Sequence, residues 1–188
     1  MNRRRLLQAL PALAVGGAAH GAEPAWSAPA PRLPDLALLD HRGEPQRLQP
    51  LFAAGPVAVN FIYTGCASFC PPQTAIFRQL QGLLDTPPRL AGMLLSISID
   101  PLSDTPAALA RYAARFEARL GVREHWLMLT GSPAQIDAVL AGFGLHAAAL
   151  VDHPAQVWVG HAARARWTRT LGLASATDLA RWMRAAAA

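Results

Sequence analysis

The chain contains two cysteines, Cys66 and Cys70, with three residues between them. A thiolate is both a nucleophile and a ligand for soft metal ions, so the pair could exchange disulfides or bind a metal. In a helical turn, side chains at i and i+4 face the same way, with Cβ atoms about 5–6 Å apart. A disulfide needs Cβ atoms about 3.8 Å apart and hence a modest backbone adjustment, whereas chelation of one soft ion needs little. The spacing is compatible with both chemistries.

Two structural roles for the cysteines are less favoured. A disulfide that closes so short a loop contributes little stability on the chain-entropy account. A structural zinc ion takes four ligands, and the sequence has no further cysteine and no C-x-x-C or H-x-x-x-H motif to supply them. Thiolates favour Cu(I), and an added imidazole makes a site acceptable to Cu(II) as well. A site with only three ligands would be open, which suits transfer of a metal.

The elements around the cysteines predict a reactive position. Residues 57–63 form a near-continuous apolar run, typical of a strand buried on both faces. Pro71 and Pro72 are tolerated only in the first turn of a helix, so the strand passes into a helix at the cysteines. The apolar stripe expected for that helix is Ile76, Leu80, Leu83 and Leu84. Strand-to-helix transitions are where open α/β sheets place their chemistry, and the helix dipole there favours thiolate.

The rest of the chain predicts one α/β domain. Further buried strands are expected at 93–99, 126–130 and 155–159, and a half-exposed antiparallel strand at 163–168. Helices are expected behind the N-cap Thr105, behind a capping box at 132–135, and behind Ser175, where the last helix would bury Leu179, Trp182 and Met183. With an N-terminal β-hairpin that turns at Arg42-Gly43, this order predicts a thioredoxin-like fold: a central mixed sheet flanked by helices, over residues 35–188.

The N-terminus has the pattern of an export signal. Three arginines at 3–5 precede a short apolar stretch at 6–19 and small residues near 22, which predicts a signal peptide at 1–22 of the Sec or twin-arginine type. The stretch is short for a membrane span, although an uncleaved anchor is the alternative. Residues 23–34 are Pro-rich and predict an extended linker. We therefore expect a periplasmic protein whose membrane tether is open to question.

Composition argues against one class of partner. The net charge is +5, and all 17 basic residues are arginines, but those outside the N-terminus are scattered. No basic stripe with interleaved aromatic residues is present, so nucleic acid is not an expected partner. We expect a monomer.

Three segments resemble the signatures of the SCO/SenC family. Residues 59–71 are similar to its T-x-C-x-x-x-C-P motif, residues 96–106 to its S-I-D-P-x-x-D-T-P motif, and residues 151–153 to a late Asp-His. The resemblance implies a thioredoxin-like domain that binds copper, as Cu(I) or Cu(II), through Cys66, Cys70 and His153, with Asp100 as an acidic residue near the site. It also implies a copper chaperone role in building the dinuclear copper centre of cytochrome c oxidase. The expected partner is then the copper-bearing subunit of that oxidase or another copper protein.

Alternatives remain open beside this prediction. Pro154 follows His153 where Thr or Ser is commoner in the family, residues 160–163 replace the family's usual turn, and His146 and His161 are alternative ligands. A thiol-disulfide oxidoreductase, with Cys66 and Cys70 as its redox-active pair and no obligatory copper, is the main rival. A peroxiredoxin would place Thr three residues before its reactive cysteine, where this chain has Tyr63. We expect a metallochaperone rather than an enzyme.

Overall fold

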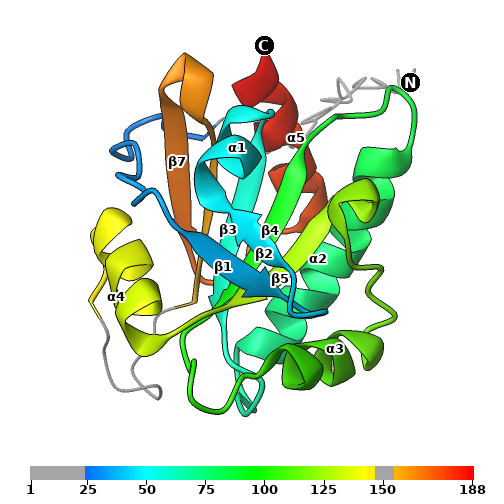
Figure 1. Ribbon diagram of the computed structural model, residues 1–188. Coiled ribbons are helices and arrows are strands. Elements are labelled where there is room, and N and C mark those ends of the chain that lie inside the picture. Colours follow the sequence, from blue (N-terminus) through cyan, green and yellow to red (C-terminus); the bar gives the residue numbers. More distant parts are fainter. Residues whose placement is uncertain (1–23, 147–154) are drawn as a thin grey trace, which may run out of the picture.

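The computed structural model describes residues 24–146 and 155–188. Its centre is a seven-stranded sheet with the strand order β2-β1-β5-β4-β3-β6-β7, covered by helices on both faces (Figure 1). The strands are β1 (Ala37–Asp40), β2 (Pro45–Arg47), β3 (Val57–Ile62), β4 (Met93–Ser98), β5 (Trp126–Thr130), β6 (Gln156–His161) and β7 (Arg166–Leu171). The helices are α1 (Leu48–Ala53), α2 (Cys70–Asp85), α3 (Pro106–Ala114), α4 (Pro133–Gly142) and α5 (Ala176–Ala187).

Both strand directions occur in this sheet, which confirms the predicted mixed thioredoxin-like fold. The strands β3, β4 and β5 are parallel, and β6, β7 and the N-terminal hairpin add antiparallel pairs on the two sides. The helices α2, α3 and α5 bury one face of the sheet, and α1 and α4 bury the other. All six residues of β3 are buried, as the apolar run predicts, because β3 lies inside the sheet between both helical layers.

The local signals at the helix N-termini are confirmed. The Thr105 hydroxyl accepts a hydrogen bond from the Ala108 N–H, and Ser132 and Gln135 form the predicted capping box. Ser175 caps α5 by accepting from the Asp178 N–H at 3.1 Å. Gly43 turns the hairpin at a φ of +82°, a left-handed conformation that glycine adopts without a Cβ penalty.

Four details differ from the sequence predictions. Helix α2 buries Phe77, Leu80 and Leu84 and leaves Ile76 and Leu83 partly exposed, because the Phe77 ring packs against Trp126 at 6.0 Å between centroids. Helix α1 was not predicted; it tolerates Pro50 because that residue lies in its first turn. Residues 162–164 form a 3₁₀ turn that ends in a left-handed Ala165, so β7 begins at Arg166 and not at 163. In α5, Leu179 and Met183 are buried as predicted, whereas Trp182 is only partly so.

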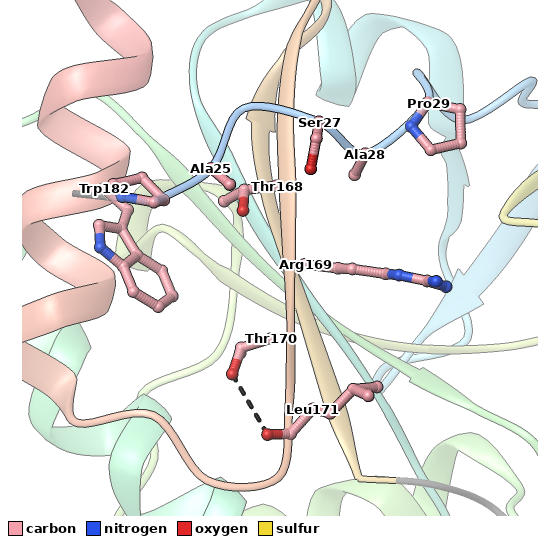
Figure 2. A pocket seen from close by; sticks show the side chains of 10 residues that line it. Ala25, Ser27, Ala28, Pro29, Thr168, Arg169, Thr170, Leu171 and Trp182 are labelled. Carbon is pink, nitrogen blue, oxygen red and sulfur yellow. Dashed lines mark hydrogen bonds between the residues drawn. The ribbon is translucent and has the colours of Figure 1, made fainter. Parts of the chain in front are cut away.

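The Pro-rich segment at 24–34, hereafter the strap, lies along the domain. The Ala28 N–H donates to the Trp167 carbonyl at 3.1 Å, and the Arg32 N–H donates to the Gly142 carbonyl at 2.8 Å. The Arg166 guanidinium stacks over the Trp26 ring at 5.2 Å. Figure 2 shows the strap passing across β7 between Trp182 and Pro29. This segment is therefore held by backbone hydrogen bonds at two places.

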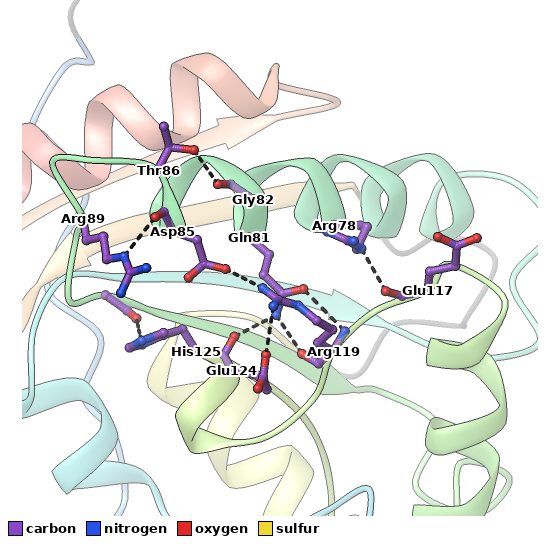
Figure 3. Close-up of polar contacts among 11 residues, drawn as sticks. Arg78, Gln81, Gly82, Asp85, Thr86, Arg89, Glu117, Arg119, Glu124 and His125 are labelled. Carbon is purple, nitrogen blue, oxygen red and sulfur yellow. Dashed lines mark hydrogen bonds and ion pairs between the residues drawn. The ribbon is translucent and has the colours of Figure 1, made fainter.

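A polar network fixes the second half of α2. The Gln81 amide donates to the carbonyls of Arg119 and Glu124, both at 2.7 Å, and its oxygen accepts from the Arg119 N–H (Figure 3). The Arg119 guanidinium pairs with Asp85 and Glu124. Because Gln81 is buried, these hydrogen bonds compensate for its desolvation and hold α2 against the segment that precedes β5.

Within residues 24–146 and 155–188, no helix has the length and apolar character needed to cross a membrane.

Candidate metal and thiol site

The two cysteines lie where β3 passes into α2, as predicted. The Cys66 N–H donates to the Tyr63 carbonyl at 3.1 Å, which closes a tight turn directly after β3. Three residues later Phe69 occupies the N-cap position of α2, and Cys70 is the first residue of the helix. The prolines at 71 and 72 fit there because the first-turn N–H groups have no intrahelical acceptor.

Both cysteines are free thiols with little exposure. The exposed fraction is 8% for Cys66 and 3% for Cys70. The Cys70 N–H donates to the Cys66 sulfur at 3.4 Å, and the Ser68 hydroxyl lies 3.7 Å from the same sulfur. Cys66 is thus the more accessible thiol of the two and lies at the positive end of α2.

The pKa values of the two thiols move in opposite directions. Burial raises the pKa of Cys66, but hydrogen bonds from the Cys70 thiol and from the backbone at Cys70 and Ser68 outweigh it and lower the pKa to about 6. Burial raises the pKa of Cys70 to about 12, and its hydrogen bond to Cys66 adds to the effect. At neutral pH, Cys66 is therefore a thiolate and Cys70 a thiol that donates to it.

This asymmetry predicts the pH profile of alkylation by iodoacetamide, which reacts with thiolates. Deprotonation of Cys66 is half complete near pH 6, so its alkylation rate should rise through that pH and reach a plateau by pH 7.5. Cys70 should stay unmodified throughout, and mass spectrometry of the digested protein distinguishes the two sites. A Cys66 rate that continues to climb above pH 8, as for an ordinary thiol, would contradict the assignment.

A buried carboxylate anchors the start of the cysteine loop. Asp104 is 0% exposed and accepts hydrogen bonds from the Thr64 hydroxyl and the Ser98 hydroxyl, both at 2.6 Å. It also accepts from the Thr64 N–H at 3.1 Å. Through Asp104, these contacts connect Thr64 to Ser98 at the end of β4. The sequence signal was the second family motif, which contains Asp104, but no local pattern connects residues 40 positions apart.

Asp100, the acidic residue that the resemblance placed near the site, is more exposed than Asp104. It is partly exposed and accepts from the Ser103 N–H at 3.3 Å, which stabilises the turn after β4. Its charge acts on Tyr63, whose pKa is raised first by burial, then by the charge and hydrogen bond of Cys66, and last by the charges of Cys70 and Asp100. Asp100 therefore lies close enough to affect the cysteine loop electrostatically, whereas Asp104 holds it.

A second polar contact positions the first turn of α2. The Asn60 amide in β3 donates to the Gln73 side-chain oxygen at 3.1 Å, and the Gln73 amide donates to the Gln156 carbonyl at 3.4 Å. All three residues are buried. Gln73 thus connects the turn that carries Cys70 to β3 and to the first residue of β6. The sequence did not predict this connection, because Gln73 and Gln156 lie 83 positions apart and no local pattern relates them.

The structure separates the histidine candidates. His153 lies outside the described residues, so its role as the third ligand stays a prediction. His161 is at the end of β6 that pairs with the beginning of β3, whereas the cysteines follow the other end of β3. Since β3 spans six residues at about 3.3 Å each, His161 is about 20 Å away, and the alternative that it binds metal beside the cysteines is wrong. His146 is exposed in the segment after α4.

The donor set in the described part is the two sulfurs. Among residues 24–146 and 155–188, no three side chains of His, Cys, Asp or Glu gather at one point to hold a metal ion. Two thiols four residues apart, one of them ionised at neutral pH, fit a soft monovalent cation such as Cu(I). The buried surroundings exclude most solvent from these sulfurs.

Comparison with known proteins identifies relatives of this chain. A family model described as SCO1/SenC matches residues 28–168. The mitochondrial SCO2 homolog of Bos taurus is 33% identical over 135 residues, which cover 66% of this chain and 48% of that protein. The SCO1 protein homolog of Bacillus subtilis is 35% identical over 72 residues, or 38% of this chain and 35% of that protein. The chain spans about half or less of the length of the curated relatives it matches.

Solved structures share the fold. BsSco, described as a member of the Sco family of cytochrome c oxidase assembly proteins with a disulfide switch, superposes with a TM-score of 0.70 and 21% identity, covering 85% of this chain and 95% of its own. Copper-bound ScoI of Bradyrhizobium japonicum superposes with a TM-score of 0.61 and 18% identity, covering 80% and 96%. At these identities, the likeness supports the thioredoxin-like fold.

Proposed function

Because the chain belongs to the SCO1/SenC family, we propose that it is a periplasmic copper chaperone that delivers copper to, or matures, the dinuclear copper centre of cytochrome c oxidase. The observation that carries this proposal is the cysteine pair at the junction of β3 and α2, with one thiol ionised at neutral pH. Structures of copper-bound relatives, including yeast Sco1, support copper as the cargo. The client would be the copper-bearing subunit of the oxidase or another copper protein.

The two cysteines, the residues that anchor their loop, and His153 have different roles in copper binding. Cys66 offers a thiolate at the more exposed position, so it is the first sulfur that an incoming Cu(I) meets. Cys70 is protonated, and its coordination would release a proton. The hydrogen bonds of Asp104 and Gln73 keep the two halves of the loop in place while the cargo enters and leaves. His153 would supply the imidazole that makes the site acceptable to Cu(II).

Titration of the reduced protein with each oxidation state tests the proposal. Both Cu(I) and Cu(II) should bind with a stoichiometry of one, and the Cu(II) form should show sulfur-to-copper charge-transfer absorption. If that absorption is absent and a weak competing chelator removes Cu(I) from the protein, the proposed copper function is refuted.

His153→Ala is expected to weaken Cu(II) binding by about tenfold to a hundredfold while Cu(I) binding changes less, because two sulfurs satisfy Cu(I) better than Cu(II). Competition titrations with a chromophoric chelator measure both affinities. The matched control is His161→Ala, at the far end of β6, which should leave both unchanged. Equal losses in the two histidine variants would remove His153 from the site.

The thiol asymmetry also supports a second function, reduction of client cysteines. The Cys66 thiolate would attack one sulfur of a client disulfide and form a mixed disulfide, and the other client sulfur would leave as a thiolate. Cys70 would then lose its proton and attack Cys66, which releases the reduced client and leaves a Cys66–Cys70 disulfide. Turnover of a model disulfide without copper, retained in His153→Ala, would favour this function over metal delivery.

Export is part of the proposal. The arginines at 3–5, the short apolar stretch behind them and the small residues near 22 support a periplasmic location reached by the Sec or twin-arginine route. Fractionation of cells that express the tagged chain tests it, with Arg3→Gln/Arg4→Gln as the variant that should distinguish twin-arginine export.

A further inference from the structure

The outer edge of β7 is an open sheet edge. Strand β7 is at one end of the sheet, and the Trp167 carbonyl accepts the Ala28 N–H of the strap, so this carbonyl points away from β6. In an antiparallel strand, successive residues direct their backbone groups to alternate sides. The backbone groups of Arg169 and Leu171 therefore face the same outer edge as those of Trp167.

These outward groups lack partners in the part of the chain that the structure describes. The N–H groups of Arg169 and Leu171 and the Arg169 carbonyl have no hydrogen bond there. The Leu171 carbonyl accepts only a long bond of 3.4 Å from the Thr170 hydroxyl (Figure 2). A row of unpaired N–H and C=O groups is a template for one more strand, and the Ala28 bond already occupies its first position.

Space is available beside this edge. A cavity of about 560 Å³ lies between the strap and β7, lined by the strap residues Ala25 and Ala28, by Arg169 and Leu171, and by Trp182 of α5. Leu171 is 73% exposed, which is unusual for a leucine at the end of a strand. An added strand would cover Leu171 and place its alternate side chains in the cavity.

The charge at this edge selects the occupant. Arg169 is exposed, stacks over the Trp158 ring at 5.7 Å and has no carboxylate partner among the described residues. A second copy of the chain fits poorly, because antiparallel self-pairing centred on Arg169 would place two guanidinium groups opposite each other. An extended segment with Asp or Glu opposite Arg169 fits both the backbone groups and the charge.

We propose that the β7 edge from Arg169 to Leu171 binds an extended acidic segment of a client protein by strand addition. Leu171 is paired with Gln156, at the same end of the sheet as the end of β3 that carries the cysteines. Two strand spacings, about 10 Å, separate β7 from β3, so a client bound at this edge has its neighbouring surface beside Cys66. That the bound protein is a client for copper or thiol exchange rests on the proposed function; the edge site itself does not.

A peptide titration followed by NMR tests the site. The probe is a capped hexapeptide, Thr-Val-Glu-Val-Asp-Val, added to the isotope-labelled full chain. The amide resonances of Arg169 and Leu171 should shift the most, and both amides should become protected from hydrogen exchange. The same peptide with its alternate backbone nitrogens methylated should not bind, because strand addition needs those donors. Binding that survives methylation, or shifts that cluster away from β7, would overturn the proposal.

Variants separate this site from the copper site. Arg169→Glu should weaken peptide binding about tenfold, since it replaces an attraction by a repulsion across the strand pair. Leu171→Pro should abolish binding because it removes an outward N–H, whereas Leu171→Ala keeps that N–H and should retain measurable binding. Copper titrations should be unchanged in Arg169→Glu. Unaltered peptide binding in Arg169→Glu, or a dimer in sedimentation that Leu171→Pro dissolves, would contradict a client site even if copper binds as proposed.

Discussion

Replacing Cys66 or Cys70 with Ser is expected to abolish stoichiometric binding of both Cu(I) and Cu(II), the largest effect in the molecule. A serine hydroxyl is a hard, neutral donor, and removal of one of two sulfurs should cost more than the roughly hundredfold loss that outer-shell changes cause. Copper per protein after desalting, measured by atomic absorption, checks the result.

The matched control is Ser68→Ala. The Ser68 hydroxyl lies 3.7 Å from the Cys66 sulfur, but Ser68 is not one of the two sulfur ligands. Its variant should therefore keep one copper per chain. The fold should survive in both cysteine variants, because neither thiol is bonded to a distant segment. Stoichiometric copper in the Cys66→Ser/Cys70→Ser double variant would refute the assignment of the site.

Asp104→Ala is expected to destabilise the protein by about 3 kcal/mol, the largest stability effect of a single polar side chain here. Asp104 accepts from Thr64 and Ser98 in a fully buried position, so its removal leaves those donors unpaired. The loop that carries Cys66 then loses its connection to β4. Urea unfolding measures the stability.

One readout and one control variant separate anchoring of the loop from general destabilisation. Alkylation of Cys70 should become detectable in Asp104→Ala under conditions where the protein is still folded, because the loop opens locally. The control is Asp100→Ala, whose carboxylate makes one long bond of 3.3 Å to the Ser103 N–H and is partly exposed. If Asp100→Ala costs as much as Asp104→Ala, the anchoring role of Asp104 is wrong.

The sequence predicted elements whose signals are local. The caps at Thr105, Ser132 and Ser175 involve donors only three residues away, so residue type and spacing are sufficient to find them. The same holds for the position of the cysteines, because the apolar run of β3 and the prolines of α2 are contiguous with them.

What the sequence could not predict depends on contacts between distant segments. The anchoring of Thr64 by Asp104 and the bridge from Asn60 through Gln73 to Gln156 require the folded sheet. The early start predicted for β7 came from an alternation of small and polar residues at 163–168 that a left-handed Ala165 interrupts. Side-chain size decided the buried face of α2, where Phe77 packs against Trp126.

The pairing of β3 with β6 has a consequence for folding kinetics. Val57 pairs with Gly160, about a hundred positions later, whereas the contacts of β3 with β4 are much closer in sequence. Closing so long a loop loses chain entropy before the hydrogen bonds and packing of the strand pair can offset the loss. This pairing should therefore form late and slow folding. Until it forms, Gln73 lacks its acceptor on β6, and both thiols belong to an incompletely covered helix start. If the chain folds in the proposed periplasmic location, the interval before β6 docks is when the cysteines are most exposed to unwanted oxidation.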